Sequence, residues 1–119
     1  MLPPHLKLPN SETFRRTIRR GFRAGRGTVV LHLHHREDEL CGSYHPRFGL
    51  IVSKAVGNAV LRHRTSRKLR ALILAHIDAF PDQADIVIRA LPKAGQADFK
   101  ELETDVLAAL KKIQSKSAR

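Results

Sequence analysis

Five cationic side chains fall within nine residues of the segment GNAVLRHRTSRKLR, which spans positions 57–70. They are Arg62, Arg64, Arg67, Lys68 and Arg70. Guanidinium groups bind phosphate through two parallel hydrogen bonds, and four of the five residues carry one. No acidic residue is interleaved with them, so their mutual repulsion is relieved when an anion binds. These residue types therefore predict binding of a phosphate backbone rather than bond cleavage.

The apolar residues of this region predict a helix over 58–79 that positions the cations. Helical spacing is shown by Leu61, Leu69, Leu72, Ile73, His76, Ile77 and Phe80. At about 100° per residue the cations fall in a sector of roughly 160° on the opposite side, except that Arg62 lies nearer the apolar edge. Asn58 is the predicted N-cap, and Gly57 would let the backbone approach a phosphate. The helix is expected to pack on a sheet and to hold its cations outward.

The remaining segments predict a small α+β domain. The expected elements are a helix from Asn10 or Ser11 to about Arg20, strands at 28–35 and 47–53, the basic helix, a strand at 84–91, a loop at 92–96 and a helix that Asp98 caps. The first two strands are expected to pair antiparallel through a long hairpin, and the strand–helix–strand segment predicts a parallel crossover. Residues 1–119 are interpreted as one RNA-binding domain, with an extended segment at 1–9 and a frayed tail at 114–119.

The charge distribution favours nucleic acid as the partner. The 119 residues carry a net charge of +11, and residues 1–80 hold 15 basic and 5 acidic side chains whereas 81–119 hold 7 and 6. Such a field favours a polyanion through counterion release. A membrane surface is the competing polyanion, but the basic helix needs its apolar side for the core. The single Cys41 and the lack of any apolar run near the roughly 20 residues of a membrane span lead us to expect a cytoplasmic protein.

Two metal-based alternatives have weaker support. A metal-dependent nuclease would need paired carboxylates, but the acidic cluster at 37–39 is typical of a solvated loop. A zinc site would have to be drawn from His32, His34, His35, Cys41 and His45. Their spacing matches no closed Cys and His pattern. His32 and His34 share one face of the predicted strand, where imidazoles could stack on bases or have no role, and both interpretations stay open.

The stretch VSKAVGNAVLRHRTSRKLR, residues 52–70, resembles the signature of the bacterial ribonuclease P protein subunit. That signature runs approximately Val-Ser-Lys-Lys-x-Gly-Asn-Ala-Val-x-Arg-Asn-Arg-x-Lys-Arg-x-Leu-Arg. The likeness extends to an early helix that contains Phe14 and ends at Gly21, and to Asp85-Ile86-Val87 in the last strand. It implies an α-β-β-β-α-β-α order, with a ribosomal-protein-like sheet and a left-handed crossover. The additional strand is expected within 22–28 or in the hairpin.

The resemblance also implies a function. The family is the protein subunit of a ribozyme that removes the 5′ leader of precursor transfer RNA, so the expected partners are ribonuclease P RNA and precursor transfer RNA. Magnesium is expected to be bound mainly by the RNA subunit and the substrate, none by the protein alone, and no side chain is expected to be catalytic. No membrane and no obligate protein partner are implied. The alternative is a ribosomal-type protein that scaffolds RNA without a role in cleavage.

Two sets of site residues follow from the resemblance. Contacts to the catalytic RNA are implied for Lys54, Asn58, Arg62, His63, Arg64, Arg67, Lys68 and Arg70. A cleft for the single-stranded leader is implied for Phe14, Ile18, Val30 and His32. The chain departs from the family pattern at Ala55 and Ser66, where the family has Lys, at His63, where it has Asn, and at His32, often an aromatic residue. We expect RNA affinity to rise below about pH 6.5, because His32 and His63 would become positively charged there.

Overall fold

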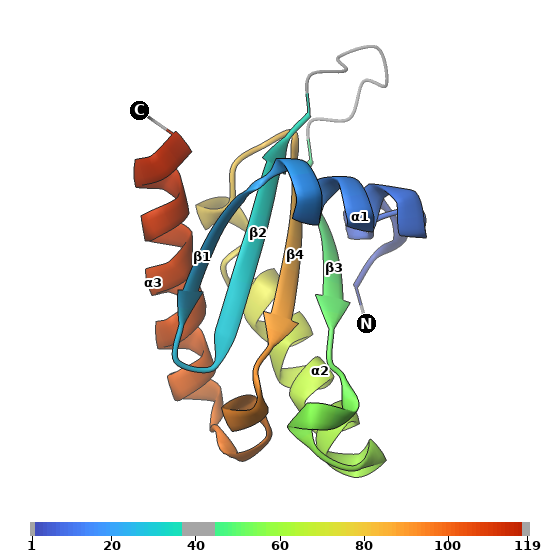
Figure 1. The fold of residues 1–119 in the computed structure, drawn as a ribbon, viewed down its shortest axis with the longest axis vertical. Helices are drawn as coiled ribbons and strands as arrows, with labels where there is room; N and C mark the ends of the chain where they lie inside the picture. Colours follow the sequence, from blue (N-terminus) through green and yellow to red (C-terminus); the bar gives the residue numbers. More distant parts are fainter. Residues whose placement is uncertain (1, 37–44, 118–119) are drawn as a thin grey trace.

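The computed structural model describes residues 2–36 and 45–117. It contains a four-stranded mixed sheet of order β1-β2-β4-β3 with helices on both faces (Figure 1). The strands are β1 (Phe22–Arg26), β2 (Val29–His35), β3 (Arg47–Ile51) and β4 (Ala84–Ala90). The helices are α1 (Ser11–Arg20), α2 (Ala59–Ala75) and α3 (Phe99–Ser117). Short 3-10 helices are η1 (Pro4–Leu6), η3 (Lys54–Val56), η4 (Ile77–Ala79) and η5 (Pro92–Gln96), so the segment expected as a loop at 92–96 is helical.

The strand neighbours differ from those predicted. β2 pairs antiparallel with β1 and with β4, and β3 pairs parallel with β4. The expected antiparallel pairing of 28–35 with 47–53 is therefore wrong. All five residues from Ala84 to Ile88 are buried, on both faces of the strand, and a strand of this kind belongs in the middle of a sheet. β4 takes the central place between β2 and β3.

The additional strand implied by the family resemblance is β1, at one of the two expected places. It forms a hairpin with β2 through the turn at Gly27 and Thr28, with Ala24 opposite Leu31. Ala24 is buried whereas the other four residues of β1 are exposed. The strand is held by its pairing with β2 and by its contacts with α3, and its single buried residue gives a weak apolar signal in the sequence.

The parallel crossover from β3 through α2 to β4 is confirmed. In Figure 1 both strand arrows point down, α2 lies behind the sheet, and the chain moves from β3 on the right to β4 on its left. This arrangement is a left-handed crossover, as the resemblance implies, although such connections are right-handed in about 98% of cases.

The two faces of the sheet have different coverings. Ile86 and Ile88 belong to the main apolar core with residues of α2 and α3, whereas Asp85 and Val87 point to the opposite face. In Figure 1 α1 crosses in front of that opposite face near its upper end. The core includes Leu31, Leu33, Phe48, Leu69, Leu72, Ile73, Leu102, Val106, Leu110 and Ile113. None of the helices in the described ranges is long and apolar enough to cross a membrane.

Several element ends differ from the sequence-based expectation. α2 ends at Ala75 rather than near 79, because the His76 amide donates to both Leu72 and Ile73 and the chain then tightens into η4. Pro81 also disfavours helical backbone at the residue before it. The last helix begins after the predicted cap Asp98, whose Oδ1 accepts from the Glu101 amide at 2.8 Å.

Within the described residues, both terminal segments contain more regular structure than predicted. The segment 114–119 was expected to fray, but α3 continues through Ser117, and Lys116 Nζ donates to the Arg23 carbonyl at 2.6 Å; positions 118 and 119 lie outside the described residues. The segment 2–9 is extended only in part, because it contains η1. Its leucines at 2, 6 and 8 are buried, and the Leu8 amide donates to the Phe48 carbonyl at 2.9 Å.

A buried carboxylate connects three strands on the α1 face. Asp85 has a fully buried side chain, and its Oδ1 accepts from Arg36 Nη1 at 2.9 Å and from Arg47 Nε at 2.8 Å. Arg47 Nη2 also donates to Oδ2 at 3.0 Å, and Arg16 Nη2 of α1 lies 4.0 Å from the carboxylate. Arg36 follows β2 and Arg47 opens β3, so this single side chain of β4 joins both neighbouring strands.

Replacing Asp85 with Asn should destabilise the protein strongly, because two largely buried arginines lose their counter-charge. We expect Asp85→Asn to lower the free energy of unfolding by about 3–5 kcal/mol in urea denaturation. Asp82→Asn, at an exposed position before β4, is the matched control, with an expected change within about 0.5 kcal/mol. Equal stabilities of the two variants would contradict the role given to Asp85.

Candidate nucleic-acid interface

The start of α2 is fixed by local contacts. Asn58 is the N-cap, as predicted, with its Oδ1 accepting from the Leu61 amide at 3.0 Å. Gly57 has a φ of +151°, and an added Cβ would lie 2.6 Å from Leu61 Cδ1. Glycine is therefore required here by the fold itself, before any phosphate is considered. Lys54 lies just ahead, exposed in η3.

The predicted division of α2 into an apolar side and a cationic side is present. Leu69, Leu72 and Ile73 are fully buried in the core. Exposed positions on the helix include His63, Arg64 and Arg67, whereas Arg62, Lys68 and Arg70 are half-buried. The helix thus holds cations at the surface on a backbone that the core immobilises.

The half-buried cations of α2 lie against the protein. Lys68 Nζ donates to the Ala97 carbonyl at 3.0 Å, which connects α2 to the segment before α3. Arg62 Nε and Arg70 Nε are buried and have no hydrogen-bond partner among the described residues. The aliphatic stems of these arginines therefore cover apolar surface, while their guanidinium groups stay near solvent.

Two hollows lie along the cationic side of α2. One has a volume of about 390 Å³ and is lined by Ala59, Val60, His63, Arg64 and Arg67. The other has a volume of about 480 Å³ and is lined by Arg64, Arg67, Lys68, Arg70, Ala71, Leu74 and Phe99. Arg64 and Arg67 belong to both, so they stand between the hollows.

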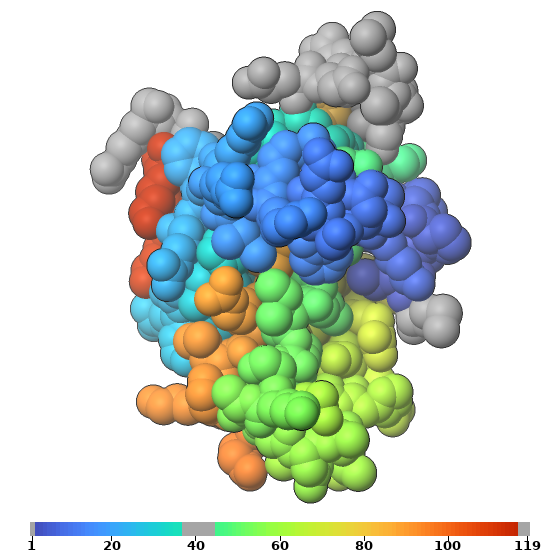
Figure 2. All heavy atoms as spheres, turned by 45° about the vertical axis from the view of Figure 1, so that its right-hand side comes forward, coloured from blue at the N-terminus to red at the C-terminus, as the bar shows by residue number. Residues whose placement is uncertain are grey.

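A second cationic surface lies on α1. Asn10 caps this helix by accepting from the Thr13 amide at 2.9 Å, and Thr13 and Thr17 are buried beneath it. The outer side of α1 has a hollow of about 390 Å³ lined by Glu12, Arg15, Arg16, Arg19 and Arg20. In the view of Figure 2, α1 (blue) covers the upper part of the molecule and the start of α2 (yellow-green) forms its lower right.

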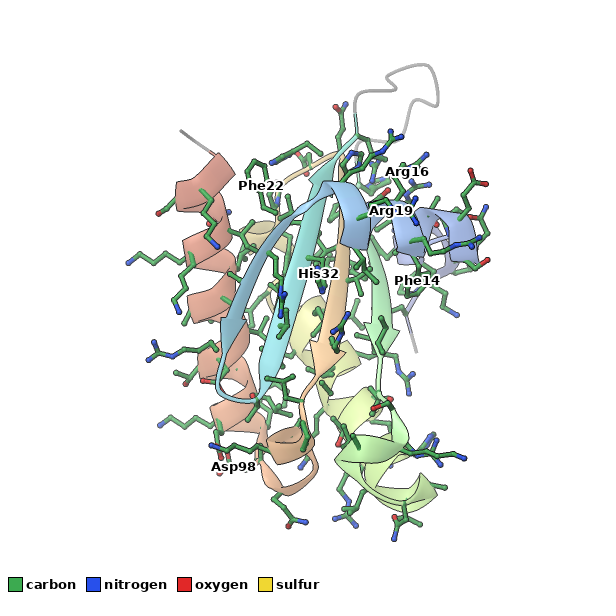
Figure 3. All side chains as sticks on the ribbon, in the orientation of Figure 1. Phe14, Arg16, Arg19, Phe22, His32 and Asp98 are labelled. Atoms are coloured by element: carbon green, nitrogen blue, oxygen red, sulfur yellow. The ribbon has the colours of Figure 1, made fainter. Side chains whose placement is uncertain are left out.

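The structure places the four implied leader-cleft residues on the α1 face of the sheet. Phe14 and Ile18 are half-buried on α1, and Val30 and His32 are buried on the same face of β2. A Cβ on Gly49 would collide with the Phe14 ring, so glycine at this position of β3 lets the ring approach the sheet. Figure 3 shows His32 in mid-sheet below α1 and Phe14 toward β3.

The imidazole of His32 is poorly suited to carry a charge. Only 3% of the residue is exposed, and neither ring nitrogen has a hydrogen-bond partner among the described residues. Burial, followed by the positive charges of Arg89 and Arg23, lowers the pKa of His32 from its ordinary value of 6.5. Any contribution of a charged His32 to RNA affinity is therefore shifted to lower pH than the expected value of about 6.5. His63, the other histidine of that expectation, is exposed on α2.

Two cations beside His32 were missed by sequence reasoning. Arg23 lies opposite His32 in the β1–β2 register, and Arg89 follows Val87 on the same face of β4. Because side-chain directions alternate along a strand, the predicted strand at 84–91 could have identified Arg89 as lying on the same face as Val87. Arg23 could not be found in this way, because the resemblance left two places open for the additional strand and gave no register for it.

The histidines considered for zinc do not come together with other ligands in the described part of the chain. Within residues 2–36 and 45–117, no group of three His, Cys, Asp or Glu side chains is placed to hold a metal ion. The acidic cluster 37–39 and Cys41 lie outside the described residues.

Sequence comparison connects this geometry to a family. The ribonuclease P family profile matches residues 2–114. A ribonuclease P protein component from Corynebacterium diphtheriae is 55% identical over 118 residues, which cover 98% of this chain and 99% of that protein. One from Rhodococcus opacus is 46% identical over 115 residues, covering 95% and 92%.

Comparison of folds agrees with the sequence comparison. The ribonuclease P protein of Staphylococcus aureus superposes with a TM-score of 0.77 at 24% identity, covering 89% of this chain and 93% of that one. The protein from Thermotoga maritima gives a TM-score of 0.76 at 21% identity, covering 90% and 96%. The chain therefore belongs to the ribonuclease P protein family, the protein component of the ribonucleoprotein endoribonuclease that processes transfer RNA.

Proposed function

We propose that this chain binds the catalytic RNA of ribonuclease P through α2 and the 5′ leader of precursor transfer RNA through the α1 face of the sheet. The observation that carries the proposal is the placement of Arg64 and Arg67, exposed on a helix whose other side is fully buried. Cations held on a rigid helix bind phosphates without first losing backbone freedom.

Contact with the catalytic RNA is assigned to the residues at the start and along the outer side of α2. They are Lys54, Asn58, Arg62, His63, Arg64, Arg67, Lys68 and Arg70. Lys68 uses one of its three donors on Ala97, so we assign it both to positioning α2 and to phosphate contact. Asn58 acts mainly as the helix cap. The exposed arginines supply most of the counterion release.

The leader is assigned to the surface formed by Phe14, Ile18, Val30 and His32. Bases of a single strand stack on aromatic and apolar side chains without strong sequence preference. The lowered pKa keeps His32 neutral at physiological pH, and we assign its largely buried ring to the floor on which a leader base stacks. We assign the leader phosphates to Arg23 and Arg89, whose charges act on His32 from the neighbouring strands.

Bond cleavage is assigned to the RNA subunit, with Mg²⁺ bound by that RNA and by the substrate. On this proposal the protein raises the affinity for precursor transfer RNA and lowers the Mg²⁺ concentration that cleavage requires. The second candidate function is scaffolding of RNA without an effect on cleavage, which the cationic surface of α2 would serve equally well.

Reconstitution distinguishes these functions. Precursor transfer RNA is incubated at low Mg²⁺ with the protein, with a bacterial ribonuclease P RNA, or with both, and release of the leader is measured. We expect cleavage at low Mg²⁺ with both components and none with the protein by itself. Arg67→Glu should abolish the stimulation, whereas Lys111→Glu, an equal change of charge at an exposed site on α3, should preserve it. Cleavage by the protein by itself would identify a nuclease, and an unstimulated RNA would identify a scaffold.

The leader assignment predicts different effects for two substitutions of His32. His32→Ala removes the ring and should reduce the affinity advantage of leader-bearing over leaderless transfer RNA by about 5- to 140-fold, the equivalent of 1–3 kcal/mol per stacked base. His32→Phe keeps an aromatic ring and should retain most of the advantage. The two affinities are measured on the assembled holoenzyme with Ca²⁺ in place of Mg²⁺. An unchanged advantage in the folded His32→Ala variant would exclude His32 from the leader site.

The lowered pKa of His32 predicts a pH-dependent stability. Between about pH 6.5 and the lowered pKa of the folded chain, the unfolded chain binds a proton at this residue that the folded chain does not, so the free energy of unfolding falls as the pH falls through this window, by at most about 1.4 kcal/mol per unit. His32→Phe lacks this dependence. Urea denaturation of both proteins between pH 7.5 and 5.5 should show the wild type losing stability relative to the variant. A constant difference, or one of opposite sign, would contradict a buried neutral imidazole.

A further inference from the structure

The cationic side of α2 also exposes large apolar side chains. Val60 is 64% exposed and Leu74 is 42% exposed, and Phe99 at the start of α3 is 37% exposed. Leu74 and Phe99 lie in the same hollow of about 480 Å³ as Ala71. This surface therefore combines apolar groups with charges, and a phosphate backbone by itself would leave the apolar groups uncovered.

The walls of this hollow are cationic. Arg64, Arg67 and Arg70 line it beside the apolar residues, and all three come from α2. A planar aromatic ring can lie against Phe99 and Leu74, and guanidinium groups stack on or hydrogen-bond to such a ring and its attached anion. A nucleotide has both parts in one molecule.

The hollow is also preformed. Its apolar residues come from two helices, whose relative position is fixed by the bond from Lys68 Nζ to the Ala97 carbonyl at 3.0 Å. At the other end of α2, His76 Nε2 and Glu103 Oε2 of α3 are 2.7 Å apart. Asp98 caps α3 immediately before Phe99. The volume of about 480 Å³ lies within the range of small-molecule sites and is large enough for a base.

We propose that the hollow between α2 and α3 binds one unpaired nucleotide of the RNA that contacts α2, with its base against Leu74 and Phe99 and its phosphate on Arg67 and Arg70. The inference rests on the proposed function of α2 and adds a base contact to its phosphate contacts. It explains why aromatic and branched side chains are exposed among arginines on an RNA-binding surface.

The proposal is tested by the salt dependence of binding to a bacterial ribonuclease P RNA. Phe99→Ala should weaken binding by about 5- to 140-fold without changing the slope of log affinity against log salt, because no charge is lost. Phe99→Leu should recover only part of the loss, since it restores apolar area but no ring. Arg67→Ala should weaken binding and make the slope shallower by about one. Phe22→Ala, at an aromatic residue of β1 that is 40% exposed, is the control and should bind like the wild type.

These outcomes separate the inference from the proposed function. If Phe99→Ala binds within about twofold of the wild type while Arg67→Ala is weakened, the nucleotide site is excluded and the proposed function stands. If neither variant is weakened, the proposed function of α2 fails. A Phe99→Ala variant with a shallower slope would show displaced arginines instead of a lost base contact, and would also overturn the inference.

A small-molecule titration tests the base contact directly. AMP and ribose 5-phosphate are added separately to the ¹⁵N-labelled protein, and the amide signals of Ala71 and Phe99 are followed by NMR. We expect AMP to shift these signals saturably in the wild type and not in Phe99→Ala, and ribose 5-phosphate to leave them nearly unchanged. Equal shifts with the two compounds would mean that the hollow binds only an anion, which contradicts a nucleobase site.

Discussion

The buried carboxylate of Asp85 is the interaction on which the α1 face of this protein depends. An ionised group without water is costly unless hydrogen bonds and opposite charge replace its solvation. Here two arginines supply three short hydrogen bonds, at 2.8, 2.9 and 3.0 Å. Since one arginine follows β2 and the other opens β3, the carboxylate joins strands that do not pair with each other. A chain with a net charge of +11 thereby uses a single acid to fix the part of its sheet that α1 covers.

The same central strand also supports the opposite face, because alternate residues of a strand point in opposite directions. Ile86 and Ile88 extend the apolar core that anchors α2, while Asp85 organises the side on which α1 lies. The two cationic helices are thus held on opposite faces of one sheet (Figure 1). Acids elsewhere serve internal contacts: Asp105 accepts from the Thr28 amide and hydroxyl at 3.0 and 2.7 Å, and Glu103 pairs with His76. Among the described residues, the arginines and lysine of α1 and α2 form no ion pair except Arg16, which lies 4.0 Å from Asp85, so most of these cations remain for an external polyanion.

Much of this arrangement could be predicted from the sequence, and there is a physical reason for each part that could not. Helical periodicity and an N-cap located α2 and its outward arginines, because both signals are local. The antiparallel pairing of 28–35 with 47–53 was predicted wrongly, because apolar alternation identifies the face a residue points to but not the neighbouring strand. The residues of β1 did not indicate a strand, since the segment FRAGR buries only one small side chain, that of Ala24. The pKa of His32 is lowered first by burial under other elements and then by the charges of Arg89 and Arg23 on the two neighbouring strands, so the shift could not be derived from the sequence of β2.

Photo-crosslinking on the assembled holoenzyme tests most directly whether the two faces of the sheet serve different RNAs. A benzophenone amino acid is placed at position 14 on α1 or at position 67 on α2, and the crosslinked RNA is mapped in the presence of precursor transfer RNA. Position 67 should crosslink to the catalytic RNA, and position 14 to the 5′ leader. Crosslinks from both positions to the same RNA segment, or from position 67 to the leader, would contradict the division of the protein into two RNA-binding faces.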